Sequence, residues 1–390
     1  MSRRLRAATV CLLALALLAV AGVSRALARQ HGPEVRLGFV ATFSGENFRS
    51  GRDALEAARF AVETANKAGI PAIDGKPCRV TLFVADDKAS PAQAAQAVHD
   101  LVTRKHVMAV IGPYPSDLAD AAAKAAEAVR VPLIAPSATA AVVTAGRPHI
   151  FRIAFSDAFQ GQVLGRFARK RLGLARVTVI ANKDRLASTS LSDAFVRAFT
   201  GCGGKAQVFF YEDRTRDFGA VAQQALADAP EAVFLPNADK ESVLAALALR
   251  KAGFGGTLLG GDAWDGPEVS GLSAFAGASF VDHWRADRPG NASKHYVAAF
   301  RREHKRPPTE LGALTQDAVA VVLAAVARAG SVNPEAVTKA LMDLPPHDGV
   351  TGTFDFVDDG NPVKSLFITT VAKDGSCTET LEMPAPDPCP

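Results

Sequence analysis

Strand-like and helix-like stretches alternate along most of this 390-residue chain. Short apolar runs such as 35–40 and 107–111 are separated by longer stretches with apolar residues at helical spacing, and the alternation restarts after residue 153. Strands that are apolar on both faces and separated by helices are typical of parallel sheets covered by helices on both sides. We therefore predict an α/β fold of doubly wound parallel sheets.

The length of the chain predicts two lobes. Without its first 28 residues the chain retains roughly 360, more than the ~250–300 residues at which a single core stops growing. From about residue 296 to 328 two helices follow one another, and two β-rich runs, 352–356 and 365–372, close the chain. No low-complexity linker is found, which favours lobes joined by several short crossings.

Composition excludes several classes of protein. With 48% hydrophobic and 22% charged residues, the chain is neither disordered nor fibrous. The net charge of +4 comes from four arginines in the first 28 residues, and the remainder carries 40 charges of each sign. The few aromatic residues are not interleaved with basic ones, so no nucleic-acid partner is expected.

The N-terminus is typical of a secretory signal peptide. Arg3, Arg4 and Arg6 precede an apolar run over 7–23, and Ala26-Leu27-Ala28 offers a small-x-small cleavage pattern. We predict a signal peptide over 1–28 and a periplasmic protein. The alternative is a membrane anchor, because the run is near the ~17-residue lower limit for a span. No later stretch is expected to span a bilayer.

Four cysteines remain after the signal peptide: Cys78, Cys202, Cys377 and Cys389. They lack CxxC spacing and nearby histidines, which argues against zinc and thioredoxin-like chemistry. An oxidising compartment permits disulfides, and all three pairings remain open, including a Cys377–Cys389 bridge that would fasten the tail.

Familiar enzyme motifs are absent from the sequence. It contains no GxxxxGK[ST], HExxH, GxSxG or SxxK. The glycine-rich run 201–204 leads from a helix into a strand, the wrong direction for a dinucleotide site, and is interpreted as a helix-terminating turn. We predict no catalytic residues, no metal and no cofactor.

Two strand-to-helix turns carry small hydroxyl residues. In the first, 111–117, Ser116 is predicted to be the N-cap of a helix, where free N–H groups could bind a carboxylate. The second, 135–139, ends in Ser137, Ala138 and Thr139 at the same sheet edge. Ligands of parallel sheets bind at this edge, although simple capping is an equally good interpretation.

The chain resembles a known family at four places. Its segments 111–113, 134–139, 260–265 and 351–364 look like those of branched-chain amino-acid-binding proteins, the type I periplasmic receptors of ABC importers. The resemblance runs in order from Val35 to Gly375. It implies two lobes joined by three crossings, near 152–154, 280–283 and 349–352. The first lobe would contain 34–152 and 284–349, the second 153–283 and 350–390.

The resemblance also implies a binding site. Ser116 resembles the hydroxyl that holds the ligand carboxylate, and Ala138 and Thr139 resemble the pair that contacts carboxylate and ammonium. Asp262 resembles the second-lobe acid that pairs with the ammonium; alternatively it is a turn residue after Gly260-Gly261. A zwitterion needs donors at one end and a carboxylate at the other.

Two departures concern the side-chain pocket. Relatives place an aromatic residue before the glycine at Gly51, where this chain has Ser50, and Phe48 or Phe43 could compensate. Relatives also place a tyrosine in the second-lobe loop, where this chain has Leu186-Ala187-Ser188-Thr189. The pocket therefore departs from the family pattern, and a ligand other than leucine is a real alternative.

The function predicted is a monomeric solute-binding receptor that closes on a small ligand, most simply an amino acid. Its partner would be the membrane permease of an ABC importer. Two alternatives remain, since fold alone does not fix function: an exported enzyme, or a sensory or scaffolding module on the same fold.

Overall fold

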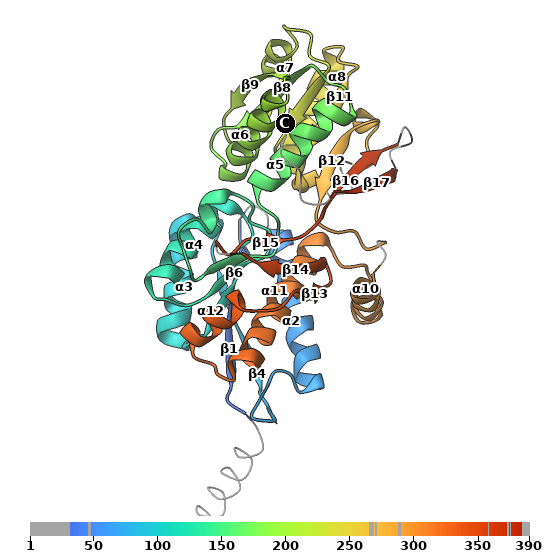
Figure 1. The fold of residues 1–390 in the computed structure, drawn as a ribbon. Coiled ribbons are helices and arrows are strands. Elements are labelled where there is room, and N and C mark those ends of the chain that lie inside the picture. The colour runs from blue at the N-terminus through green and yellow to red at the C-terminus, as the bar shows by residue number, and fades with distance from the viewer. Residues whose placement is uncertain are drawn as a thin grey trace, which may run out of the picture.

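A computed structural model describes residues 32–45, 48–264, 269, 271–287, 290–357, 359–372, 374 and 376–383. The predicted signal peptide lies outside the described residues. Two lobes, each with a sheet between layers of helices, are stacked along the long direction of the molecule (Figure 1). The α/β class and the two-lobe architecture predicted from the sequence are confirmed.

The first lobe contains a five-stranded parallel sheet in the order β4-β1-β5-β6-β7. Helices α2, α11 and α12 pack on one face of this sheet, and α3 and α4 pack on the other. The elements up to its last strand are β1 Val35–Ala41, α2 Phe48–Ala68, the hairpin β2 Ala72–Ile73 and β3 Lys76–Pro77, β4 Val80–Asp86, α3 Pro91–Lys105, β5 Ala109–Ile111, α4 Ser116–Ala128, β6 Leu133–Ala135 and β7 Ile150–Arg152.

The second lobe contains a seven-stranded sheet in the order β17-β16-β12-β11-β10-β8-β9. The five strands from β8 to β12 are parallel, and β16 and β17 extend the sheet antiparallel. Its elements are α5 Asp157–Arg166 with a π-helical turn to Arg171, β8 Arg176–Asn182, α6 Leu186–Gly201, β9 Lys205–Tyr211, α7 Gly219–Ala225, β10 Ala232–Leu235, α8 Asp239–Lys251, β11 Thr257–Gly260, β12 Ser279–Asp282, β16 Leu366–Val371 and β17 Cys377–Met383.

After β12 the chain returns to the first lobe as three helices: α10 Asn291–His304, α11 Glu310–Ala329 and α12 Pro334–Met342. The sequence pattern predicted only two. By length and hydropathy α11 could cross a membrane, which corrects the expectation that no later stretch could. Its apolar residues lie in the core of the first lobe, as expected of the central helix of a folded domain.

The last crossing lies later than the sequence predicted. Strands β13 His347–Gly349, β14 Gly352–Phe356 and β15 Pro362–Val363 form a small antiparallel sheet beside the first lobe (Figure 1). Phe354 and Phe356 pack in the first-lobe core, and the Phe356 ring lies 5.1 Å from that of Phe151. Residues 350–363, assigned to the second lobe from the sequence, therefore pack on the first. The other lobe bounds stay predictions.

Helix α11 holds the second crossing and the segment that leads into β14. Glu310 accepts hydrogen bonds from the backbone N–H groups of His283 and Trp284, at 2.8 and 3.0 Å. Asp317 accepts from the backbone of Val350 and Thr351, at 2.7 and 2.8 Å. Anchors of this kind fix the start of each connection relative to the first-lobe core.

The cysteines are partly described. Cys78 is a buried free thiol, and burial raises its pKa. Cys202, the C-cap of α6, is disulfide-bonded. Its pairing partner lies outside the described side chains, and the connectivity stays a prediction.

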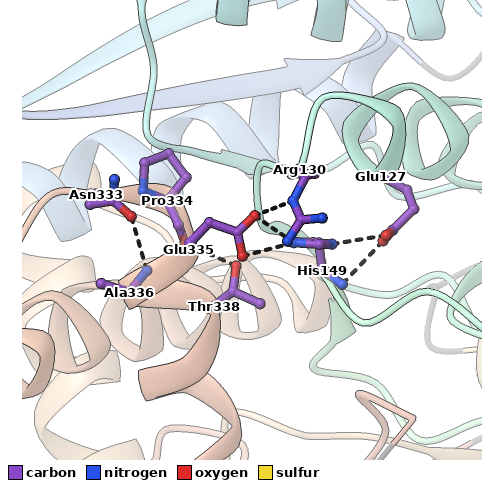
Figure 2. A network of polar contacts seen from close by, with 8 residues as sticks. All are labelled: Glu127, Arg130, His149, Asn333, Pro334, Glu335, Ala336 and Thr338. Carbon is purple, nitrogen blue, oxygen red and sulfur yellow. Dashed lines mark hydrogen bonds and ion pairs between the residues drawn. The ribbon is translucent and has the colours of Figure 1, made fainter.

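A polar network fastens α12 to the rest of the first lobe. Figure 2 shows the buried His149 ring between two carboxylates, with Nδ1 2.8 Å from Glu127 and Nε2 3.4 Å from Glu335. Arg130 also donates to Glu335. Helix α12 begins at this point, with Asn333 as its N-cap. The network therefore joins the C-terminal end of α4 to the N-terminal end of α12.

We expect His149→Ala to destabilise the protein. The substitution removes the ring that contacts Glu127 Oε1 and leaves this carboxylate only the backbone N–H of residue 149, at 3.1 Å from Oε2. The loss of this partner at a half-buried site costs roughly 1–3 kcal/mol. Urea unfolding measures the loss, and His99→Ala on the exposed face of α3 serves as the control. Equal stability of the two variants would contradict the role assigned to the network.

Candidate functional site

The two small-residue turns of the first lobe meet. The backbone N–H of Ala140, just beyond the second turn, donates to Ser116 Oγ at 3.2 Å. Ser116 was predicted to be the N-cap of α4, but the structure places it as the first helical residue after Pro115. The Ser116 oxygen therefore ties the start of α4 to the neighbouring turn.

Arg152, at the end of β7, holds the second turn in place. Its buried guanidinium donates to the carbonyls of Ala138 and Ala140, at 2.9 and 3.0 Å, and to Thr144 Oγ1 at 2.9 Å. Burial lowers the pKa of Arg152 to about 10, against the opposing charges of Asp157 and Asp359. Arg152 therefore stays cationic at neutral pH, and its hydrogen bonds hold the backbone of the turn in place.

Asp157 begins α5 at the first crossing. Its backbone N–H donates to the carbonyl of Thr139 at 2.9 Å, so the second-lobe helix starts against the first-lobe turn. The carboxyl is fully buried, and burial together with the charge of Asp262 raises its pKa to about 7, although Thr139, Ser190 and Arg152 favour the ionised form. Near neutral pH this group exists in both protonation states.

Asp262 follows β11 of the second lobe, in a short 3-10 helix over Asp262–Trp264. Its Oδ1 accepts from Gln160 Nε2 at 2.9 Å, and its Oδ2 lies 3.2 Å from His283 Nε2. Burial works to raise the pKa of Asp262, but the hydrogen bonds from His283 and Gln160 outweigh it, and the pKa lies below its usual range. Asp262 is therefore an anion.

His283 stands at the second crossing, directly after β12. Its ring lies 3.7 Å from the ring of Phe155, which belongs to the first crossing. Burial lowers the pKa of His283, with Asp262 acting in the opposite direction. The imidazole is therefore largely neutral at pH 7 and donates Nε2–H to the carboxylate.

Gln160 connects the two acids. Its amide nitrogen donates both to Asp157 Oδ1 and to Asp262 Oδ1, each at 2.9 Å. The other polar atoms of this group, Asp157 Oδ2 and Gln160 Oε1, are buried acceptors without a hydrogen-bond partner among the described residues. The second-lobe side of the site is thus rich in acceptors.

The lobes also touch beside Ser116. Asp117, next to Ser116, accepts from the backbone N–H of Leu186 at 3.2 Å, and the Leu186 side chain packs on the first-lobe core. Arg185 nearby pairs with Asp213 at 2.9 Å. Burial raises the pKa of Asp117. The contact shows that the 186–189 segment, predicted to be a loop, is the first turn of α6 and faces the other lobe.

The remaining predicted site residues lie at the periphery. Ser137 is half-buried in the second turn. Phe48 and Ser50 lie on the first turn of α2; the Phe48 ring is 37% exposed and has the Arg52 guanidinium 5.4 Å above it. Gly51 packs so closely that a Cβ would come within 1.9 Å of the Thr42 carbonyl oxygen. The roles of these residues stay predictions.

Four residues of the site were not predicted from the sequence: Arg152, Asp157, Gln160 and His283. A signal was present, since Asp157 and Gln160 are spaced i, i+3 on the first turn of a helix and therefore share a face. Arg152 is an isolated cation at the end of an apolar strand. His283 lies in no recognisable motif, and the structure shows that it pairs with Asp262.

Comparisons with known proteins agree with the fold. A family model described as periplasmic binding protein matches residues 34–376. A leucine-, isoleucine-, valine-, threonine- and alanine-binding protein of Pseudomonas aeruginosa is 26% identical over 287 residues, 73% of this chain and 75% of that protein. A leucine-binding protein from Thermotoga maritima has a TM-score of 0.83 at 29% identity, covering 90% of this chain and 99% of that one. An isoleucine complex of a branched-chain amino-acid-binding protein from Streptococcus pneumoniae has a TM-score of 0.80 at 25% identity, with the same coverages.

Proposed function

Because the chain belongs to the periplasmic binding protein family and is a solute-binding receptor, we propose that its ligand is an amino acid bound between the lobes. The carboxylate of the ligand would face the first lobe and its amine the second. As in other periplasmic binding proteins, hinge closure about the crossings would bring the two halves of the site together.

The observation that carries this proposal is the opposite polarity of the two sides. The first lobe offers the Ser116 hydroxyl at the start of the 13-residue helix α4, where the helix dipole favours an anion. The second lobe offers the Asp262 carboxylate, with a side chain 17% exposed. An α-amino acid carries the complementary charges on adjacent groups.

Each predicted contact has a role in this proposal. Ser116 donates to the ligand carboxylate, while Ser137, Ala138 and Thr139 line the turn that Arg152 supports. Asp262 accepts from the ammonium. Phe48 and Ser50 contribute to the pocket for the ligand side chain, where the chain departs from the pattern of its relatives.

The relatives support the class of ligand. The Pseudomonas protein is named for five aliphatic or small amino acids, and the Streptococcus structure holds isoleucine. By extension we propose that this receptor is exported to the periplasm by its N-terminal signal peptide. It would act there as a monomer and deliver its ligand to the membrane permease of an ABC importer.

A thermal-shift screen of the mature protein tests the proposal. A ligand that binds only the folded state stabilises it by RT ln(1 + [L]/Kd), about 2.7 kcal/mol at one hundred times Kd. We expect at least one aliphatic or small amino acid to raise the Tm. Matched carboxylic acids without the amine and amines without the carboxylate are the controls. A shift given only by a solute without a cationic group would contradict the amino-acid assignment while leaving the receptor function intact.

A further inference from the structure

The second-lobe side of the site contains two acids rather than one. Asp157 is fully buried, and its Oδ2 atom has no hydrogen-bond partner among the described residues. Gln160, also fully buried, leaves its Oε1 atom without a partner in the same part of the structure. Buried acceptors without donors are costly and rare, so each calls for an explanation.

We infer that the ligand amine binds between Asp157 and Asp262, and that Asp157 releases its proton to solvent when the amine binds. The inference rests on the proposed function and extends it by a second amine-binding acid and a proton step. The ammonium keeps its own three protons, and the proton released is the one that neutralises Asp157 in the empty receptor.

The geometry supports a shared amine subsite. Gln160 Nε2 donates to both acids at 2.9 Å, so their Oδ1 atoms lie on either side of one nitrogen. An ammonium has three N–H donors. Asp157 Oδ2, Gln160 Oε1 and the Asp262 carboxylate are the acceptors available to it.

The charges around Asp157 explain why it holds a proton in the empty receptor. Asp262, from the turn after β11, opposes ionisation, and burial adds to this effect. Arg152, from β7, favours ionisation, and so do the hydroxyl groups of Thr139 and Ser190, but burial and the charge of Asp262 outweigh them. The Nη1 and Nη2 groups of Arg152 donate to Ala138, Ala140 and Thr144. Asp262 also contacts His283, whose pKa is lowered by the charge of Lys364 and raised by that of Asp282. An incoming ammonium adds the positive charge that the pair of acids lacks.

The direction of the pH dependence follows from linkage. In the empty receptor the pKa of Asp157 is about 7, and beside an ammonium it must fall. Affinity therefore increases as the pH rises toward 7 and levels off above it, with at most about tenfold per pH unit for one proton. For the empty protein the sign is opposite: the raised pKa stabilises the fold at low pH, and this contribution is lost as the pH rises to about 7.

Isothermal titration calorimetry tests the inference, with L-leucine as the first probe and the best amino acid of the screen as the second. Titrations at pH 5.5, 6.5 and 8, each in two buffers of different ionisation enthalpy, give the affinity and the number of protons released. We expect affinity at pH 8 to exceed that at pH 5.5 by at least about tenfold, with proton release near pH 6.5. Asp157→Asn should remove both effects, and Asp228→Asn on the exposed surface should remove neither.

The outcomes separate this inference from the proposed function. Binding without pH dependence or proton release by the wild-type protein overturns the inference and leaves the amino-acid receptor standing. Proton release that persists in folded Asp157→Asn also overturns it and places the proton on another group. If no amino acid binds, both fail. The wild-type buffer comparison does not depend on any variant, so a variant that does not fold leaves the test decisive.

Discussion

Replacing Asp262 by alanine is expected to weaken an amino-acid ligand by at least about tenfold. Removal of one partner of a buried, hydrogen-bonded charge pair costs roughly 2–5 kcal/mol in binding, and about 1.4 kcal/mol corresponds to a factor of ten. The loss should be in the dissociation rate, because the amine loses its anionic partner after closure. Titration calorimetry of the wild-type and Asp262→Ala proteins measures the loss of affinity directly.

The structure alters one expectation about this variant. A turn acid that faced an open cleft would leave the Tm of the empty protein nearly unchanged when it is removed. In the structure its carboxylate accepts from Gln160 and pairs with the buried His283, and both lose their partner in the variant. We now expect the Tm to fall as well. Asp228→Ala, an exposed second-lobe acid, controls for charge. An amino acid that binds Asp262→Ala and wild type equally would rule out Asp262 as the amine partner.

The fold could be predicted from the sequence because its signal is local. Apolar runs such as 177–181 and 232–235 became adjacent parallel strands, as the alternation with helices requires. Ser90 precedes α3 with Pro91 as its first residue, as expected of an N-terminus. The third crossing was predicted too early in the chain. Phe354 and Phe356 have the pattern of an ordinary strand, and only their packing in the structure shows that they belong to the first-lobe core.

The site could be predicted only in outline. Ser116, Thr139 and Asp262 each follow a strand end, and ligands of parallel sheets bind at that edge. Their partners come from other parts of the chain: His283 lies 21 residues from Asp262, and Gln160 lies 102 residues from it. A buried pair of this kind leaves no periodic pattern. The protonation state of Asp157 depends on burial and on a charge from another segment, neither of which is visible in the sequence.

Arg152→Met is expected to be among the most destabilising single substitutions in the first lobe. The guanidinium is fully buried and donates to two carbonyls and one hydroxyl, and methionine fills the volume while supplying none of these donors. Breaking a buried ionic group of this kind costs about 3–5 kcal/mol, because the partners remain desolvated. Asp157 would also lose a nearby cation that favours its ionised form.

The consequence for the site follows from the position of the lost donors. Ala138 and Ala140 belong to the turn that faces Ser116, so the turn should loosen and ligand affinity should fall together with stability. Urea unfolding gives the loss of stability, and calorimetry on the folded fraction gives the loss of affinity. Arg130→Met, a substitution of an exposed arginine in the same lobe, should leave affinity unchanged. If Arg152→Met lowers stability but binds the amino acid as tightly as wild type, the turn does not depend on Arg152, and the support assigned to this residue is wrong.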